Sequence, residues 1–394
     1  MSVAPLHEPI SLDELLAAYR EILHLPDPGI VEVNLASVAA NRMTGDPLWL
    51  LDVGPPASGK TEIIESLCRL PDTHSVSTFT EAGLLSGSAV REGDDKPTGG
   101  LLVELGEQGI LMFKDLTTLV SEHASTRNRL FACLREVYDG KFVRSLGTKG
   151  GTPFKWEGRA GLIGGVTEVI DTVDLGLLGE RFCYYRLPEL AEPDTYLASK
   201  KALANLGHQR ENRKTLARAV ERFFANLDLP ETPPPLDATT DEWLMILAAL
   251  GARCRSSVVR GGHDHQLELV PSPERPPRFL VQLGQLYSAL TVIGVDRAET
   301  RRLVAQIALD GMTRGRRSVL DAFRNVDREH ALSSIAGHVR LPDTTTRRHI
   351  EDLTAHRVLD LVGVAPDRWI LSAWTRDQFE ALDLPDIEIG RAHV

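Results

Sequence analysis

A lysine and a threonine follow a short loop that has glycine at both ends, and these residue types at this spacing bind phosphate. The loop runs from Gly54 to Gly59, and Lys60 and Thr61 come directly after it. Glycine lets the backbone curl until successive N–H groups point inward at an anion. Lysine then reaches the β- and γ-phosphates of a nucleoside triphosphate, and the threonine hydroxyl is a ligand for Mg²⁺. This G-x-x-x-x-G-K-T pattern predicts a P-loop made of Gly54, Pro55, Pro56, Ala57, Ser58, Gly59, Lys60, Thr61 and Glu62.

The elements on either side of the loop fit this prediction. The apolar run 48–53 before it predicts a strand, and the amphipathic stretch 61–70 after it predicts a helix. A helix that begins at the loop adds the partial positive charge of its N-terminus to the phosphate site. A strand before and a helix after are the context that a P-loop requires.

The region 30–190 alternates strand and helix patterns. Such alternation predicts a parallel sheet with helices on both faces. An N-terminal segment, 1–29, precedes it and contains a helix at 11–25 with a capping-box pattern at Ser11 and Glu14. The other predicted strands are 75–79, 109–113, 161–166 and 182–187, and a further helix is predicted at 124–138.

A second acid is needed to hold Mg²⁺ beside a P-loop, at the end of a neighbouring strand. Asp115 follows the apolar run 109–113 and is predicted to be that acid. Thr61 and Asp115 are therefore the predicted magnesium ligands.

Residues 129–142, R-L-F-A-C-L-R-E-V-Y-D-G-K-F, are similar to the helix after Walker B in AAA+ ATPases. The glycine-containing stretch 143–156 resembles the hairpin before sensor 1 in one branch of that family. This branch contains minichromosome-maintenance helicases and bacterial enhancer-binding activators. The resemblance spans about residues 46 to 312. It implies an α/β P-loop NTPase (AAA+) core with a parallel sheet, an all-α lid at 191–314, and ATP with Mg²⁺ at the site.

The resemblance also implies roles for four residues. Thr167 matches the polar sensor-1 position that detects the γ-phosphate, and Arg181 matches the arginine finger. Arg186 is a second candidate for the finger, and Arg278 stands where the family places its sensor-2 arginine. Fixed cations lower the barrier because phosphoryl transfer spreads negative charge over the γ-phosphate oxygens. An arginine supplied by a neighbouring subunit implies a homo-oligomeric ring, usually a hexamer.

One position departs from the family. AAA+ ATPases normally have glutamate directly after the Walker-B aspartate, whereas Leu116 follows Asp115 here and Lys114 precedes it. Either Asp115 takes the place of the glutamate and the Mg²⁺ acid is missing, or Asp115 holds Mg²⁺ and the base lies elsewhere. Glu81 is one substitute. The departure makes a slowly hydrolysing, nucleotide-gated switch a rival to a fast motor.

The segment 315–376 has the element order of a C-terminal winged helix-turn-helix: helix, helix, turn, helix and β-hairpin. Residues 297–357 contain twelve arginines against eight acidic residues, although the chain is acidic overall. The third helix is predicted at 344–359, and hydroxyl and guanidinium groups at its start suit contacts with DNA phosphates and bases. The alternative is a module that binds protein only. The predicted DNA contacts are Thr345, Arg347 and Arg348 on that helix and Arg368 in the hairpin.

A second DNA contact is predicted in the basic stretch 143–156 and its flanks, where a ring would line its pore. A solvated basic hairpin is the alternative. The final segment, 377–394, is predicted to be a tail. The lysines and arginines concerned are Lys141, Arg144, Lys149 and Lys155.

The composition of the chain limits the classes of function that remain. The net charge of −11 argues against a general polyanion binder, so a DNA site must be a local basic patch. The four cysteines form no C-x-x-C pair, which fits a reducing cytosol better than a zinc site or a disulfide framework. Neither a signal peptide nor a membrane span is predicted, so a cytoplasmic protein is expected. Three functions remain: a DNA-translocating or remodelling ATPase, an ATP-gated DNA-binding regulator or loader, and a protein-interaction ATPase of a mobile-element or defence system.

Overall fold

The computed structural model divides the chain into two compact units. The first contains residues 1–234, 285–300 and 390–394, and the second contains 235–284 and 301–389. The predicted boundaries after 29, 190 and 314 do not coincide with this division and stay predictions. The structure describes residues 8–77, 80, 83–84, 100–144, 154–173, 181–262, 265–324, 328–363 and 366–384.

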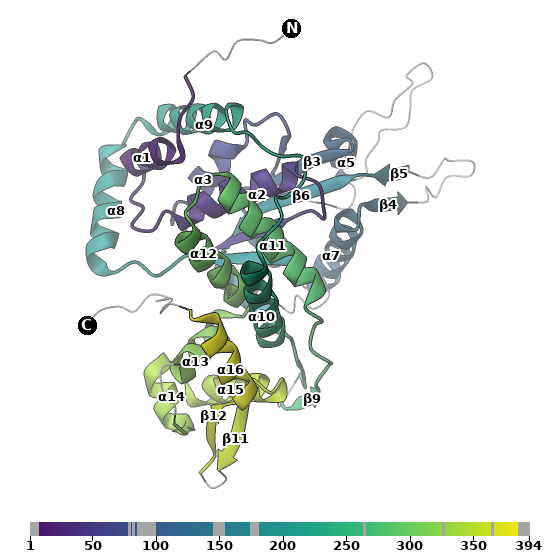
Figure 1. Cartoon of the computed structure of the whole chain (residues 1–394), viewed down its shortest axis with the longest axis vertical. Helices are drawn as coiled ribbons and strands as arrows, with labels where there is room; N and C mark the ends of the chain where they lie inside the picture. The colour runs from purple at the N-terminus through teal and green to yellow at the C-terminus, as the bar shows by residue number, and fades with distance from the viewer. Residues whose placement is uncertain are drawn as a thin grey trace. The chain divides into compact units, whose positions relative to one another are not determined.

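Five parallel strands form the central sheet of the first unit (Figure 1). Their order across the sheet is β2-β3-β6-β1-β7. The predicted parallel sheet is therefore confirmed, although β2 begins two residues earlier than expected, and residues 78–79 lie outside the described part. The strands are β1 (Trp49–Val53), β2 (Thr73–Val76), β3 (Gln108–Phe113), β6 (Arg159–Val166) and β7 (Phe182–Arg186).

One face of the sheet is covered by α2 (Gly29–Arg42) and α3 (Lys60–Leu67). The sequence did not predict α2, because its residues from Gly29 to Asn41 are buried all round and show no amphipathic stripe. Asn41 exchanges two hydrogen bonds with the backbone of Leu48, at 2.8 and 2.9 Å. A side chain at Gly161 would collide with Asn41, since its Cβ would lie 2.5 Å from Asn41 Cγ.

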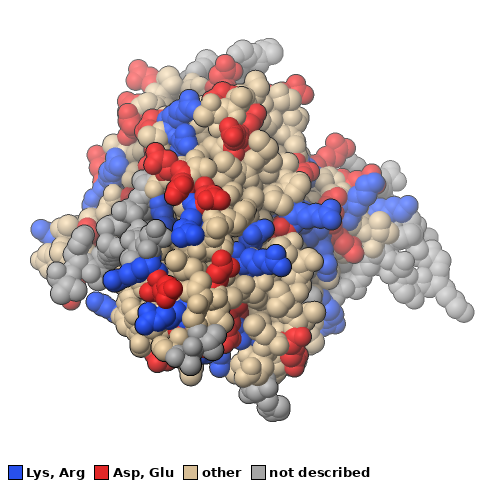
Figure 2. Space-filling model, turned by 60° about the horizontal axis from the view of Figure 1, so that its bottom comes forward, with Lys and Arg blue, Asp and Glu red and all other residues tan. Residues whose placement is uncertain are grey.

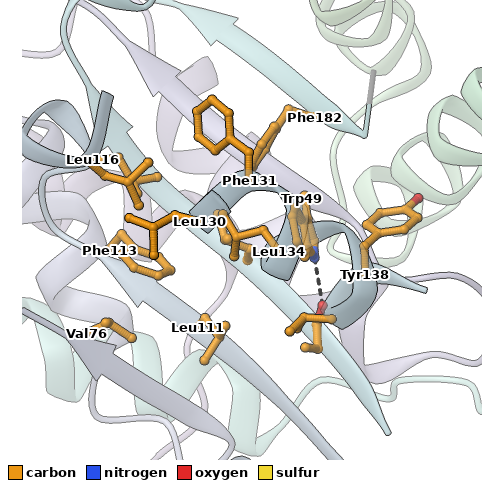
Figure 3. Close-up of a cluster of buried hydrophobic side chains, with 14 of the residues drawn as sticks. Trp49, Val76, Leu111, Phe113, Leu116, Leu130, Phe131, Leu134, Tyr138 and Phe182 are labelled. Carbon is orange, nitrogen blue, oxygen red and sulfur yellow. Dashed lines mark hydrogen bonds between the residues drawn. The ribbon is translucent and has the colours of Figure 1, made fainter. Parts of the chain in front are cut away.

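The opposite face packs on α7 (Ala124–Tyr138), and the two surfaces form a large apolar cluster (Figure 3). Trp49 lies at one side of this cluster, edge-on to Tyr138, and donates a 2.7 Å hydrogen bond to the carbonyl of Ala160. Burying one leucine or phenylalanine side chain here contributes about 1.5–3 kcal/mol. The cluster therefore stabilises the sheet that carries the loop.

The other elements of the first unit lie around this core. The helix predicted at 11–25 is α1 (Leu12–Ile22), and its capping box between Ser11 and Glu14 is confirmed. The predicted hairpin is confirmed in its described part, while residues 145–153 lie outside it. These elements also include α5 (Leu101–Leu105), α6 (Thr117–Val120), β4 (Lys141–Arg144), β5 (Phe154–Glu157), the 3₁₀ helix η1 (Glu168–Thr172), α8 (Glu192–Ala204) and α9 (Gln209–Ala225).

The second unit is mainly helical and has a three-stranded antiparallel sheet in the order β10-β12-β11. Two helices, α11 and α12, run across the division between the units. The elements are α10 (Ala238–Arg255), β8 (Val259–Arg260), β9 (Leu267–Leu269), α11 (Pro277–Val292), α12 (Arg297–Asp310), α13 (Arg314–Arg324), β10 (His330–Ala331), α14 (Leu332–Val339), α15 (Asp343–Ala355), β11 (Leu359–Gly363), β12 (Arg368–Leu371) and α16 (Ala373–Leu382).

Three predictions about this part of the chain were wrong. The region predicted as all-α contains the β8–β9 hairpin. The helix predicted to reach Leu359 ends at Ala355, because Arg357 takes a left-handed φ of 56° and the chain turns into β11. The tail predicted from residue 377 begins inside α16, whose Leu382 is buried. Within the described residues, no helix is long and apolar enough to cross a membrane.

Candidate functional site

The loop at 54–59 joins β1 to α3 at the carboxyl edge of the sheet. Its first residue, Gly54, is tied to the neighbouring strand, because its N–H donates a 3.2 Å hydrogen bond to the carbonyl of Val166 at the end of β6. Gly59 has a φ of 88°, which favours glycine, and Ala57 has a φ of 61°. Gly59 caps α3 without a side-chain hydrogen bond, so backbone N–H groups of the first turn remain available for an anion.

Lys60 lies inside the curl of this loop. Its side chain is largely buried, and the ammonium donates to the carbonyls of Gly54 and Pro55 (2.8 Å each) and to Ser58 Oγ (3.0 Å). Burial lowers the pKa of Lys60, and the charges of nearby carboxylates oppose this effect. The loop thus holds a cation at its centre through neutral acceptors, which an incoming phosphate can replace.

Asp52 is a buried carboxylate just before the loop. It is fully buried on β1, and its Oδ2 accepts a 2.9 Å hydrogen bond from Asn34 Nδ2 of α2. Its Oδ1 has no hydrogen-bond partner among the described residues. Burial raises the pKa of Asp52 to about 7, against the opposing effects of the Asn34 hydrogen bond and the Lys60 charge.

The end of β6 connects the loop to the segment that carries Asp115. A Cβ on Gly165 would lie 3.7 Å from Lys60 Cβ, and the Gly165 carbonyl accepts a 2.7 Å hydrogen bond from Leu116 N–H. Thr117 Oγ1 accepts from Thr167 N–H (3.2 Å) and also lies 3.4 Å from Thr167 Oγ1. Lys60, Thr167 and the Asp115 segment therefore converge at one edge, as predicted for parallel strands.

Asp115 is not at the end of the strand next to β1, as the sequence suggested, because β6 lies between β1 and β3. Its side chain is exposed, and its Oδ1 accepts a 2.7 Å hydrogen bond from Thr117 N–H at the start of α6. Its charge still acts on Lys60, although less strongly than that of Asp52. Asp115 therefore approaches the site from the end of β3, which β6 separates from β1.

Leu116, the residue that departs from the family pattern, belongs to the apolar cluster. Its side chain is buried and points into the cluster with Phe113 and Leu130 (Figure 3). A Cβ on Gly164 would lie 2.6 Å from Leu116 Cδ1, so the leucine packs directly on the sheet. A glutamate at this position would bury an unpaired charge, which is costly. The local fold therefore requires an apolar residue here.

Glu168 is a further carboxylate near the loop, and it was not predicted from the sequence. It follows Thr167 directly, begins η1 and is half-buried. Among the carboxylates whose charge acts on Lys60, Glu168 has a larger effect than Asp115. The signal was present in the sequence as a Thr-Glu pair at the end of an apolar run. The other substitute, Glu81, lies outside the described residues.

The two candidate arginine fingers lie at opposite ends of β7, Arg181 at its amino end and Arg186 at its carboxyl end. Arg181 precedes β7 at its amino end, is buried over the ring of Tyr138, and forms a 2.9 Å ion pair with Asp139. Because β7 runs parallel to β1, Arg181 is remote from Lys60 of the same chain. Arg186 ends β7 at the carboxyl edge and forms a 2.7 Å ion pair with Asp171 of η1.

The first turn of α3 carries two further predicted residues. Thr61 is exposed directly after Lys60. Glu62 forms a 2.6 Å ion pair with Arg213 of α9, and this hydrogen-bonded contact raises the pKa of Arg213. Glu62 therefore ties α9 to the helix that begins at the loop.

The donor set fits Mg²⁺. No group of three or more His, Cys, Asp or Glu residues that would hold a metal occurs in the described part of the chain. Mg²⁺ needs no such cage, since it keeps several waters and is bound by one or two protein oxygens together with substrate phosphates. The Thr61 hydroxyl and the exposed Asp115 carboxylate match that requirement.

The predicted DNA contacts gather in the second unit on α15 and the β11–β12 hairpin. Arg348 and Arg368 are exposed, and Thr345 is half-buried. Arg347 is oriented by a 3.0 Å ion pair with Asp367 and lies over the ring of Trp369. On the face shown in Figure 2, acidic side chains separate groups of basic ones.

The remaining predicted basic residues lie elsewhere. Arg278 is exposed in the first turn of α11. Lys141 of β4 forms a loose 3.8 Å pair with Glu157, and Lys155 on β5 is exposed. Lys149 lies outside the described residues, and the side chain of Arg144 is not described. Each of these residues stays a predicted contact.

Comparisons with known proteins give no family. No protein-family model matches the chain, and no curated protein matches it. Two solved structures, both apo A forms of the NrS-1 C-terminal region, are similar over 95% of this chain, at 12% and 10% identity. The matches cover 79% and 80% of those chains, and the TM-score is 0.28 for each. A TM-score this low implies neither a shared fold nor a shared function.

Proposed function

We propose that the first unit binds ATP with Mg²⁺ and hydrolyses it, as an ATPase of the AAA+ type. The observation that carries this proposal is Lys60, buried in the curl of a glycine-bounded loop at a helix N-terminus. Structural turns rarely bury a lysine against backbone carbonyls, whereas a phosphate site requires such a cation. Thr167 and Asp115 lie on segments that meet at the same sheet edge.

Glu168 is proposed as the general base. In the reaction, a water oxygen forms a bond to the γ-phosphorus, and its proton passes to the Glu168 carboxylate. The bond from the γ-phosphorus to the bridging oxygen breaks, and ADP and inorganic phosphate leave. Lys60 and the loop N–H groups stabilise the charge that develops on the phosphate oxygens. This role would account for the departure at Leu116, because the base would come from the start of η1, just after β6, rather than from the residue after Asp115.

Thr61 and Asp115 are the residues that would hold Mg²⁺. The ion, when bound, neutralises charge on the β- and γ-phosphates. Asp115 Oδ1 accepts a hydrogen bond from Thr117 N–H, and this contact fixes the orientation of the carboxylate at the turn into α6. The other oxygen, Oδ2, is the one proposed to bind the ion.

Two substitutions test the proposal separately. Lys60→Ala should abolish binding of a fluorescent ATP analogue, since the central cation is lost. Glu168→Gln should retain that binding but lower turnover by about 10²-fold or more, as expected for a general base. Glu122→Gln, which changes an exposed carboxylate, is the matched control and should leave both unchanged. Normal binding by Lys60→Ala would refute the nucleotide site, whereas normal turnover by Glu168→Gln would refute only the base.

We also propose that the second unit contacts DNA, which would make the chain a DNA-translocating ATPase or an ATP-gated regulator. The support is local: Arg348 and Arg368 are exposed on neighbouring elements, and Arg347 is held in place beside them. Binding to a labelled duplex, followed by anisotropy over a range of salt, should weaken in the double variant Arg348→Ala/Arg368→Ala. Its log–log salt slope should fall by about 2, one unit for each lost phosphate contact.

Arg69→Ala removes an exposed arginine of the first unit and serves as the control. Absence of binding at about 50 mM salt, where phosphate contacts are strong, would remove the DNA proposal. Turnover that rises when DNA is added indicates a motor, and constant slow turnover indicates a switch. The trans role of Arg181 in a ring stays a prediction, and it requires release of the Asp139 ion pair.

A further inference from the structure

A cavity of about 320 Å³ lies in the second unit, between the last turn of α10, the end of α15 and the segment 270–273 that follows β9. Its volume is at the lower end of the range for small-molecule sites, about 300–1,000 Å³. Two arginines line it, Arg253 from α10 and Arg357 from the turn after α15, and none of the described residues that line it is acidic. The charged side chains of its wall are therefore all positive.

The carboxylates near this cavity already have arginines of their own. Asp352 pairs with Arg316 at 2.9 Å, and Glu274, which follows the segment 270–273, pairs with Arg255 at 2.6 Å. By contrast, neither arginine of the cavity forms an ion pair with a residue that the structure describes. The local charges therefore do not cancel, and two guanidinium groups are left facing one small space.

The carbonyl groups at the helix ends do not offset this charge. A helix C-terminus carries partial negative charge on its free carbonyls, which would repel an anion. Here Arg316 donates to the carbonyls of Cys254 and Ser256 (3.2 and 2.8 Å), and the backbone after α15 turns back to bond its last carbonyls. His356 Nε2 lies 3.0 Å from the Ser257 carbonyl, so this nitrogen carries the hydrogen. Burial lowers the pKa of His356, so the ring in the cavity wall is neutral near pH 7.

Both arginines are held in place by contacts outside the cavity. The guanidinium carbon of Arg253 lies 3.7 Å from the centroid of the Trp374 ring on α16, and such stacking uses the face of the guanidinium rather than its in-plane N–H donors. Arg357 has a φ of 56°, and its carbonyl accepts a 2.9 Å hydrogen bond from Ser372 Oγ. Little order therefore has to be created when a ligand binds.

We propose that this cavity binds a small phosphate monoester. Arg253 and Arg357 hold the phosphate, and Val270 and Pro271 of the opposite wall contact the organic group. A phosphate monoester carries a charge of about −1.5 to −2 at pH 7, which matches two unpaired guanidinium groups, whereas a carboxylate carries one charge. The planar arginine fork also fits phosphate oxygens in pairs. The site belongs to the second unit and does not depend on the loop at 54–59.

Titration calorimetry of the full chain tests the proposal. The chain should carry Lys60→Ala, so that the loop at 54–59 does not contribute to phosphate binding. The probes are phenyl phosphate, benzoate and inorganic phosphate. Phenyl phosphate should bind with a Kd of about 1 mM or tighter, as expected for two charge-assisted contacts. Benzoate has the same ring and one charge, so it should bind about tenfold more weakly or worse. Inorganic phosphate, which has no organic group, should also bind more weakly than phenyl phosphate.

Two substitutions connect the binding to the cavity. In the same Lys60→Ala chain, Arg253→Gln and Arg357→Gln should each weaken binding of phenyl phosphate by about tenfold or more, because each removes one charged donor. Arg340→Gln is the matched control: Arg340 is an exposed arginine of the same unit, has the same φ of 56° as Arg357, and does not line the cavity. It should bind phenyl phosphate as the Lys60→Ala chain does.

Four outcomes would overturn the proposal. They are no binding of phenyl phosphate at about 10 mM, benzoate binding as tightly as phenyl phosphate, arginine variants that bind normally, and an equal loss in Arg340→Gln. Circular dichroism checks that each variant is folded. If Arg253→Gln unfolds because the contact with Trp374 is lost, Arg357→Gln still decides, since Arg357 is exposed. In the parent chain, Arg357→Gln should leave binding of the ATP analogue intact, so failure at the cavity is distinguishable from failure of the nucleotide site.

Discussion

Burial of Asp52 beneath the loop makes the stability of the first unit depend on pH around neutrality. The carboxyl group lies fully inside the protein, and burial raises its pKa from 3.8 to about 7. The folded state therefore favours the protonated form. The resulting stabilisation is complete below about pH 4, where the unfolded chain is also protonated, and it is lost as the pH rises through 7.

Replacing Asp52 by asparagine should remove this dependence. A difference of about three pKa units corresponds to at most about 4 kcal/mol. Asp52→Asn should therefore be more stable than the parent chain at pH 8.5 and should differ little from it at pH 4, since asparagine carries no charge at either pH. Urea unfolding at both pH values measures this difference.

Asp228→Asn, which changes an exposed carboxylate of the same unit, is the control for that experiment. It should leave the pH dependence of the parent chain intact. If Asp52→Asn keeps the same fall in stability between pH 4 and 8.5, Asp52 is not the group that titrates.

The sequence predicted the centre of the candidate site better than its rim. Lys60 was predictable because one loop motif contains the cation and both glycines within seven residues. Glu168 was missed because its proximity to Lys60 depends on the position of β6 next to β1, a pairing between strands more than a hundred residues apart. The Arg181–Asp139 ion pair likewise joins distant segments, so its burial could not be read from local sequence.

At the scale of secondary structure, elements whose apolar residues recur with a clear period were predicted, and elements without such a period were not. Helix α7 was predicted with its observed bounds, because its apolar residues recur at helical spacing. Helix α2 has no polar face, so its buried residues resemble any apolar run. The end of α15 was misplaced because Arg357, rather than glycine, takes the left-handed conformation that stops it.

Helix α8 shows the same limit for surfaces. Its sequence mixes apolar and charged residues and predicts only a helix. Which face is exposed depends on three polar contacts with the end of α1, about 180 residues earlier in the chain. The exposed face of such a helix is known only when its tertiary contacts are known.

At the scale of the whole chain, the proposed activities are divided between the two units. The loop, Thr167 and Glu168 belong to the first unit, whereas Arg348 and Arg368 belong to the second. Arg278 also belongs to the second unit, although the resemblance to AAA+ ATPases assigns it to the nucleotide. Coupling between ATP and DNA would therefore require residues of the second unit to respond when nucleotide binds.

Hydrogen exchange with and without an ATP analogue tests this coupling. Ligand binding stabilises the segments it contacts, by about 2.7 kcal/mol at a concentration of 100 Kd. Amides of residues 54–62 should therefore exchange more slowly with the analogue. If Arg278 contacts the nucleotide, the first turn of α11 should be protected as well. Arg278→Ala should then lose that second protection and keep the first, because the loop does not depend on it.

Lys60→Ala should lose both protections, which separates binding from indirect effects of the analogue. Protection confined to residues 54–62 and the ends of β3 and β6 would place the whole nucleotide site in the first unit. In that case the sensor-2 role of Arg278 is wrong, and a signal to the DNA contacts would not depend on Arg278.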